Sequence, residues 1–197
     1  ATGQGPVANA IGEYGEDIVV LCGNNCNTDS QVIVAGPALT GDAAIVAYDK
    51  AAANEADVKA SFEAAAVALG HPVRIGVQQG ATTESALRSW LKKMDVSLNE
   101  FGEEGAGTVT LVDVKANTLP TVLATGDDID MMAASQPYPD TAVASVAGAY
   151  RVGSNADTDS YDVACYINAK NIYEQKEASI KAFIEDLKVA TDYLSDE

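Results

Sequence analysis

The residues best suited to chemistry lie in a glycine turn that joins a strand to a helix. Residues 73–77 alternate as in a strand, and the helix after the turn begins with two hydroxyl side chains, Thr82 and Thr83. A helix start leaves backbone N–H groups without partners and carries the positive end of the helix dipole, so it can hold an anion. We expect Thr82 or Thr83 to be the N-cap, with Glu84 or Ser85 in the first turn. The alternative is an ordinary capped helix in an α/β domain.

The other reactive side chains form no catalytic or metal-binding pattern. His71 is the single histidine, and the three cysteines fit no zinc spacing. A catalytic triad has no obvious place either, so we expect no metal, no cofactor and no enzyme active site. Cys22 and Cys26 are separated by three residues, and the sequence leaves open whether they form a strained local disulfide.

The chain is strongly acidic, with a formal net charge of −17 from 29 acidic and 12 basic residues. This charge argues against nucleic acid and against anionic membrane surfaces, because both are bound through Lys and Arg. Hydrophobic residues make up 47% of the chain, which indicates a globular protein. No apolar run approaches the roughly 20 residues that a membrane span needs, and the chain starts without a signal-peptide pattern.

Hydrophobic periodicity predicts helices and strands that alternate along the chain. This order is typical of a mostly parallel sheet with helices on both faces. The segment 43–48 is open between helix and strand. We expect helices at 6–14, 54–69, 82–94, 119–125, 139–148 and 172–194, and strands at 17–22, 31–35, 73–77, 109–114, 129–133 and 162–168.

Open α/β sheets bind ligands beyond the carboxyl ends of their strands, where loops and helix starts meet. Three loops fit this description, at 1–6, 78–85 and 135–139. Each combines Gly or Pro with a small polar residue and then enters a helix. We therefore expect these loops to contribute to a binding site.

Five short motifs follow one another between Pro72 and Val143. They are R-I-G-V-Q-Q-G-A-T-T at 74–83, L-K-K-M at 91–94, V-T-L-V-D-V at 109–114, L-P-T-V-L-A-T-G-D-D-I-D-M at 119–131 and Q-P-Y at 136–138. Their order resembles that in the substrate-binding proteins of nitrate/sulfonate/taurine-type ABC transporters. Thr2–Pro6 and the strand at 17–21 also resemble the first lobe of that family. The chain departs from the family pattern at Asp95, where glycine is usual, at Gln136, where glutamate is usual, and at Ala134, where an aromatic is usual.

The resemblance implies a two-lobed, periplasmic-binding-protein-like α/β fold with mostly parallel sheets. We expect residues 1–70 to form part of the first lobe, 71–150 the second lobe, and 151–197 the return to the first lobe with a C-terminal helix. Full-length relatives have a further N-terminal strand–helix–strand unit and further C-terminal helices. We therefore expect a partial chain.

The resemblance also implies the extracytoplasmic solute-binding component of an ABC importer. Such a protein captures a small anionic or polar solute, such as a sulfonate, nitrate or taurine, between two lobes and delivers it to the membrane permease. A periplasmic or other extracytoplasmic location follows, with a lipid anchor possible in the full-length protein. The expected solute contacts are Thr2, Gly3 and Gln4 from the first lobe and Gln79, Thr82, Thr83, Gln136 and Tyr138 from the second.

Two other functions stay open. One is the ligand-sensing effector domain of a transcriptional regulator, which has the same architecture, and the other is an enzyme on the same fold. For single residues the sequence favours plainer roles: Trp90 in the core, and Arg74 and Arg88 on a solvated surface. Tyr138, between two prolines, is open between packing and a solute wall. The identity of the solute is not readable from the sequence.

Overall fold

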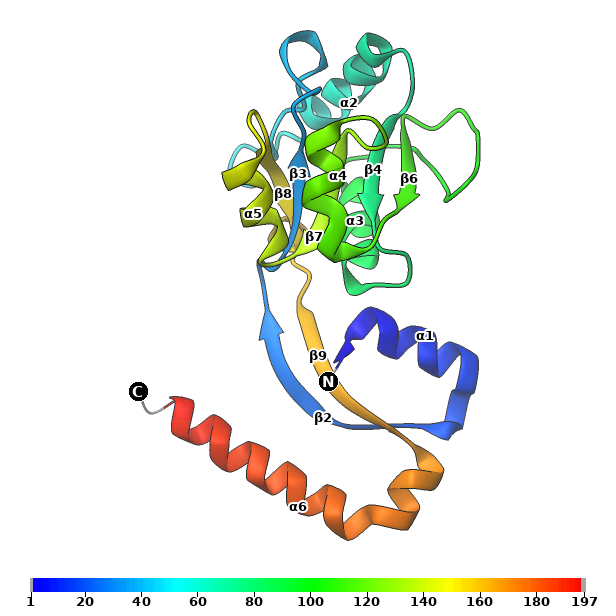
Figure 1. The fold of residues 1–197 in the computed structure, drawn as a ribbon, viewed down its shortest axis with the longest axis vertical. Helices are drawn as coiled ribbons and strands as arrows, with labels where there is room; N and C mark the ends of the chain where they lie inside the picture. The colour runs from blue at the N-terminus through cyan, green and yellow to red at the C-terminus, as the bar shows by residue number, and fades with distance from the viewer. Residues whose placement is uncertain (1, 196–197) are drawn as a thin grey trace. The chain divides into compact units, whose positions relative to one another are not determined.

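The structure is a computed structural model that describes residues 2–195. The chain forms two compact units (Figure 1). Unit 1 consists of Ala1–Cys26 and Val163–Glu197, and unit 2 is the continuous segment Asn27–Asp162.

Unit 2 is built on a six-stranded sheet in the order β5-β6-β4-β7-β3-β8. The pairs β5–β6, β6–β4 and β4–β7 are parallel, whereas β3 pairs antiparallel with both β7 and β8. Figure 1 draws β4 and β6 side by side and pointing in the same direction. The mostly parallel sheet predicted from the sequence is therefore confirmed. The strands are β3 (Gln31–Ala35), β4 (Val73–Val77), β5 (Leu98–Asn99), β6 (Val109–Asp113), β7 (Met131–Ser135) and β8 (Tyr150–Ser154).

Helices cover both faces of this sheet. On β7, Met131 and Ala133 point into one hydrophobic cluster and Met132 and Ala134 into the other, because successive strand residues face opposite sides. The first cluster is closed by α2 (Glu55–Leu69) and α3 (Thr82–Lys93), and the second by α4 (Leu119–Thr125) and α5 (Tyr138–Ser145). Unit 2 is therefore a three-layer α/β/α structure with a strand core that is apolar on both faces.

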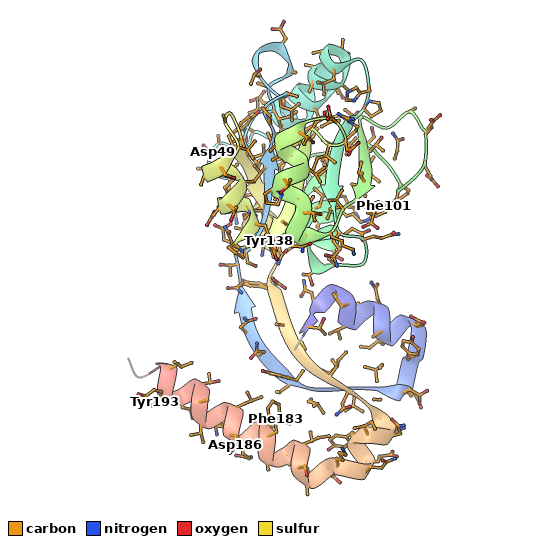
Figure 2. All side chains as sticks on the ribbon, viewed as in Figure 1. Asp49, Phe101, Tyr138, Phe183, Asp186 and Tyr193 are labelled. Carbon is orange, nitrogen blue, oxygen red and sulfur yellow. The ribbon has the colours of Figure 1, made fainter. Side chains whose placement is uncertain are left out.

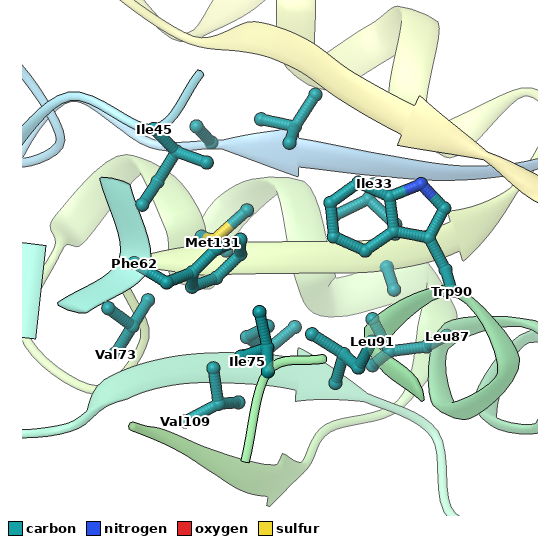
Figure 3. Close-up of a cluster of buried hydrophobic side chains, with 14 of the residues drawn as sticks. Ile33, Ile45, Phe62, Val73, Ile75, Leu87, Trp90, Leu91, Val109 and Met131 are labelled. Carbon is teal, nitrogen blue, oxygen red and sulfur yellow. The ribbon is translucent and has the colours of Figure 1, made fainter. Parts of the chain in front are cut away.

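The larger cluster is organised around Trp90 (Figure 3). The Trp90 ring is 1% exposed and meets the Phe62 ring edge-on, with 6.2 Å between the ring centroids. On β8, a Cβ atom at position 153 would lie 2.4 Å from Trp90 Nε1, so Gly153 is what allows the indole to approach the strand. The core position expected for Trp90 is confirmed.

Unit 1 contains much less buried apolar surface. Its strands form a three-stranded sheet in the order β1-β9-β2. Among the described residues, Val7 is its only buried hydrophobic side chain. The elements are β1 (Thr2–Gly3), α1 (Gln4–Tyr14), β2 (Ile18–Asn27), β9 (Asp162–Ala169) and α6 (Lys170–Ser195), with a non-helical residue at Lys176.

Several expected elements agree with the structure to the residue, namely the strands at 31–35 and 73–77 and the helix at 119–125. The strand expected at 129–133 begins two residues later, as β7 at Met131–Ser135. Short strands β5 and β8 were not expected. The open segment 43–48 is neither helix nor strand beyond a 3₁₀ turn at Gly41–Ala43.

Three backbone N–H groups of the segment after that turn donate hydrogen bonds to side chains or to a strand carbonyl. Ile45 N–H donates to the Tyr150 hydroxyl at 2.9 Å, and Val46 N–H donates to Ser61 Oγ at 3.0 Å. Tyr48 N–H donates to the carbonyl of Val152 at 2.9 Å. These partners come from distant parts of the chain, so local periodicity could not resolve the segment.

The compact units differ from the expected lobes at both boundaries, 70/71 and 150/151. Strand β3 and helix α2 belong to unit 2, because β3 lies between β7 and β8 in its sheet and α2 packs on its core. Residues 151–162 also stay in unit 2, since β8 pairs with β3. The chain enters unit 2 near residue 27 and leaves it near residue 162.

Cys22 and Cys26 both lie on strand β2 and are free thiols, as is Cys165 on β9. Four residues of strand span about 13 Å at 3.3 Å per residue. A disulfide needs Cα atoms about 4.4–6.8 Å apart, so the local disulfide is excluded in this structure. Across residues 2–195, no helix has the length and apolarity to span a membrane, and no His, Cys, Asp and Glu side chains gather in a group of three that could hold a metal.

Candidate functional site

Three parallel strands of unit 2 end at the same edge of the sheet. Val77 at the end of β4 is paired with Asp113 at the end of β6, and β7 runs parallel on the other side of β4. The chain then enters α3, α4 and α5 in turn. We call this the carboxyl edge and define it by residues 78–82, 113–118 and 135–138. Two of the three loops expected from the sequence meet here.

Two backbone N–H groups of the glycine turn, which precede the N-cap Ala81 of α3, bind carboxylates. Gln79 N–H donates to Asp113 Oδ1 at 2.9 Å, and Gly80 N–H donates to Glu84 Oε2 at 2.6 Å. These two carboxylates take the place that was expected for a solute anion. The turn is thus suited to oxyanions, and in this structure it is occupied by the protein's own side chains.

The N-cap of α3 is not a threonine. Ala81 is the N-cap and makes no side-chain cap hydrogen bond, while Glu84, in the first turn as expected, reaches back to Gly80. Thr83 is the second residue of α3 and is 8% exposed. Its hydroxyl donates to the side-chain oxygen of Gln31 on β3. The expectation that Thr82 or Thr83 is the N-cap was therefore wrong, because Ala81 holds that position and the helix begins at Thr82.

Thr83 belongs to a polar network that the sequence analysis missed. The Gln31 amide donates to Asp162 Oδ2 at 2.6 Å, and Ser30 Oγ donates to the same oxygen at 3.2 Å. The Gln31 backbone N–H donates to Asn155 Oδ1 at 3.0 Å. A glutamine at the first position of an otherwise apolar strand was the available signal, since a buried amide needs several partners.

Replacing Thr83 by valine keeps the volume of the side chain and removes the hydroxyl. The Gln31 side-chain oxygen then loses its donor in a buried position, and we expect unfolding free energy to fall by about 1–3 kcal/mol. Urea unfolding followed by fluorescence of the single tryptophan measures this change. The matched control is Ser85→Ala, an exposed hydroxyl in the same helix turn, which should change stability by less than about 0.5 kcal/mol. Equal effects of the two changes would contradict the network.

Asp29 lies beside this network and is held in its charged form. Burial raises the pKa of Asp29, but hydrogen bonds from Ser154 and Arg151 lower it by more, so the net shift is downward. With Asp113, Asp162 and Glu84, the carboxyl edge and its surroundings are rich in carboxylates.

The loop after β7 carries Gln136 and Tyr138. The Gln136 amide donates to Asp140 Oδ1 at 3.0 Å, and Gln136 N–H donates to the carbonyl of Ser30 at 2.9 Å. Tyr138 begins α5 and packs, partly buried, against the smaller hydrophobic cluster. Figure 2 labels Tyr138 in unit 2. Packing is therefore at least part of the role of Tyr138.

The three expected contacts of the first lobe lie in unit 1. Thr2 and Gly3 form β1, paired antiparallel with Cys165 and Ala164 of β9, and Gln4 begins α1. The helix starts two residues earlier than expected. The loop expected at 1–6 is thus a strand-to-helix junction; Ala1, its first member, lies outside the described residues.

Arg74 and Arg88, both expected on a solvated surface, have different surroundings. Arg88 pairs with Glu84 and Glu100, and both hydrogen bonds raise the pKa of the guanidinium, with Glu100 contributing more. Arg74 pairs with Asp130, whose side chain is 1% exposed. The solvated role expected for Arg74 was wrong, because the strand residue points at a buried carboxylate.

Two grooves of unit 2 lie at the opposite, amino edge of the sheet. One holds about 430 Å³ and is lined by Lys59, Lys92, Ser97 and others; the second holds about 460 Å³ and reaches His71. Both include Thr108, which directly precedes β6. The size of a groove is a weaker indication of a ligand site than the direction of the strands, since ligands of open α/β sheets bind at the carboxyl ends of the strands.

The sequence matches no protein-family model, and a search of curated proteins finds no match. Solved structures do match. The periplasmic aliphatic sulphonate binding protein of Escherichia coli aligns with a TM-score of 0.59 and 14% identity over 94% of this chain and 52% of its own. A ligand binding component of an ABC-type import system from Staphylococcus aureus, with zinc bound, aligns with a TM-score of 0.58 and 13% identity. The alignment covers 93% of this chain and 52% of its own.

The periplasmic nitrate-binding protein of Synechocystis PCC 6803 aligns with a TM-score of 0.58 and 14% identity, over 87% of this chain and 40% of its own. The chain thus spans about half the length of these three solved proteins, or less. The expected fold is confirmed on this evidence. This chain has the α/β fold of the two-lobed periplasmic substrate-binding proteins of ABC import systems.

Proposed function

We propose that this chain is part of the extracytoplasmic solute-binding component of an ABC importer. Its solute is a small anionic or polar molecule of the sulfonate, nitrate or taurine kind, which it passes to a permease in the membrane. The observation that carries the proposal is the fold, which is shared over nine-tenths of this chain with proteins named for binding sulphonate. The proposal places the protein outside the cytoplasm.

The carboxyl edge of unit 2 supports a binding role. Three helix starts follow strand ends there, and the glycine turn already binds two carboxylate oxygens through its N–H groups. A solute oxyanion would replace one of these carboxylates or bind beside them. We propose Gln79, Thr82, Gln136 and Tyr138 as the solute contacts of this unit, with Thr83 positioning the turn through Gln31.

In unit 1 we propose Thr2, Gly3 and Gln4 as contacts, by the resemblance of this junction to the first-lobe loop of the family. The junction joins a strand to a helix start, which has the same chemistry as the carboxyl edge of unit 2. An enzyme on this fold and a regulator domain are not supported by any further feature of the described residues.

A thermal-shift screen of the whole chain tests the proposal. The panel contains nitrate, alkanesulfonates, carboxylates and pyrimidines. A solute that binds only the folded state adds about 2.7 kcal/mol of stability at a hundredfold excess over its dissociation constant. We expect one chemical class to raise the melting temperature.

The matched variants are Gln79→Ala at the carboxyl edge and Lys92→Ala in the amino-edge groove, both exposed. We expect the first to reduce the thermal shift and the second to leave it unchanged. A chain that responds to no solute in the panel would contradict the proposed function. A shift lost only in Lys92→Ala would move the site to the groove.

A further inference from the structure

The two carboxylates on the glycine turn are held in different ways. Glu84 has both oxygens bound, since Oε2 accepts from Gly80 N–H at 2.6 Å and Oε1 from Arg88 Nε at 2.8 Å, and its side chain is 15% exposed. Asp113 is exposed, and its Oδ1 accepts from Gln79 N–H at 2.9 Å. No ion pair in the described part of the chain includes Asp113. The Asp113 carboxylate is therefore the one that an anion from solution can replace.

The backbone on either side of Asp113 is also held by hydrogen bonds that do not involve its carboxylate. Asp113 is the last residue of β6 and is paired with Val77, the last residue of β4; Figure 1 shows the two strands side by side. Val114, the next residue, donates its N–H to the carbonyl of Val77 at 3.1 Å. Ala116 N–H donates to Gln78 Oε1 at 3.2 Å. Removing the Asp113 side chain should therefore open one N–H of the turn and leave the turn in place.

An oxyanion that binds at Gln79 meets two obstacles, and both come from Asp113. It must displace the carboxylate from the N–H, so its apparent affinity falls in proportion to the fraction of molecules in which that N–H is open. It also approaches a second negative charge, in a chain whose formal net charge is −17. A solute group that donates a hydrogen bond meets neither obstacle, because it can bind the exposed Asp113 carboxylate where it stands.

We propose that Asp113 is a specificity residue of the solute site. It competes with oxyanions for the N–H of Gln79 and favours solutes that present a hydroxyl, amide or ammonium donor at this position. The inference rests on the proposed function, because it takes the carboxyl edge of unit 2 as the solute site. It narrows the solute class from anionic or polar molecules to those with a hydrogen-bond donor facing Asp113.

Titrations of methanesulfonate and methanesulfonamide at constant ionic strength test this proposal, with the amide signal of Gln79 followed by NMR. The two probes have the same skeleton, but the first is an anion and the second is neutral with an N–H donor. Asp113→Ala should tighten methanesulfonate binding about threefold to tenfold, the ratio that corresponds to the net contribution of one hydrogen bond. The same change should not tighten the binding of methanesulfonamide.

Asp140→Asn is the matched control for the loss of one charge. Asp140 is exposed and directly follows the edge residues 135–138, and asparagine keeps an acceptor for the Gln136 amide. This variant should change the binding of either probe by less than about 1.5-fold, because salt screens exposed charges. Asp113→Asn keeps an acceptor at Gln79 without the charge, so it should tighten methanesulfonate binding less than Asp113→Ala and more than Asp140→Asn. That comparison decides the test if Asp113→Ala does not fold.

Three results would overturn the proposal. One is the same methanesulfonate constant in Asp113→Ala and in the unchanged chain, and another is a Gln79 signal that methanesulfonate does not move even in Asp113→Ala. The third is an equal gain in Asp140→Asn, because the effect would then depend on net charge alone. A chain that responds in the thermal-shift screen but fails here keeps the proposed function. A chain that responds to no solute in that screen loses the proposed function, whether or not Asp113 competes at Gln79.

Discussion

Replacing Arg74 by methionine is expected to lower the free energy of unfolding by about 3–5 kcal/mol, because it leaves a buried carboxylate without its cation. Arg74 Nη2 and Nε donate to the two oxygens of Asp130 at 2.8 and 3.1 Å, and the Arg74 backbone N–H donates to Oδ2 at 2.8 Å. The Asp130 side chain is 1% exposed. The hydrogen bonds that Arg74 donates to Asp130 raise the pKa of Arg74, so the guanidinium stays charged.

Two variants make this expectation specific. Arg88→Met removes an arginine whose partners, Glu100 and Glu84, are 51% and 15% exposed and so less buried than Asp130, and it should cost less than about 1 kcal/mol. Arg74→Met combined with Asp130→Leu removes both charges and should recover most of the lost stability. Urea unfolding followed by Trp90 fluorescence measures all three. If Arg74→Met and Arg88→Met had the same small effect, Asp130 would not depend on Arg74.

Replacing Trp90 by alanine is expected to cost about 3–5 kcal/mol, the range for removing a large buried aromatic side chain. The ring fills the space between α3, Phe62 and β8, and its Nε1–H donates to Asp157 Oδ2 at 2.9 Å. Both the cavity and the lost hydrogen-bond donor contribute to this loss of stability. Because the fluorescent reporter is removed, far-UV circular dichroism in urea is the measurement.

The Trp90 prediction has a graded control. Trp90→Phe keeps an aromatic ring and loses the donor, so its cost should be intermediate, about 1–3 kcal/mol. Val67→Ala, at a side chain 83% exposed on α2, should change stability by less than about 0.5 kcal/mol. A cost for Trp90→Ala as small as that for Val67→Ala would contradict the packing described for the core of unit 2.

The fold of unit 2 was largely predictable, because its signals are local. Val73, Ile75 and Val77 are all fully buried on one face of β4, as the alternation predicts. Gly126 ends α4 with φ at +70°, a conformation that favours glycine and that the L-P-x-x-L-x-x-G motif anticipates. At position 95, where the family has glycine, Asp95 also adopts a positive φ of 53°. The family pattern thus reflects a backbone requirement that this chain meets with aspartate.

The site was predicted less completely, because its partners are distant in the sequence. The turn at 78–82 and the loop at 135–138 were placed at one edge correctly. The roles of Asp113 and Gln31 were missed, since they depend on which strands become neighbours. The same holds for Arg74, whose outward direction on β4 was right but whose partner lies 56 residues later. Periodicity gives the face of a residue and not the residue opposite it.

Unit 1 shows a second limit of sequence-based prediction. Apart from the short strand β1, its helices and strands were expected close to where they occur, yet Val7 is the only described hydrophobic residue of the unit that is buried. The long helix expected at 172–194 is present as α6. What packs on a helix depends on surfaces that the periodicity of one segment does not specify.

The most direct test of the proposed solute site is hydrogen exchange of the whole chain with and without the solute found by thermal shift. Slower exchange is predicted at the carboxyl edge, in residues 78–82 and 135–138, because bound solute shields their N–H groups. Residues 97–108, which border the amino-edge grooves, should be unchanged. Protection confined to residues 97–108, with none at the carboxyl edge, would contradict the account.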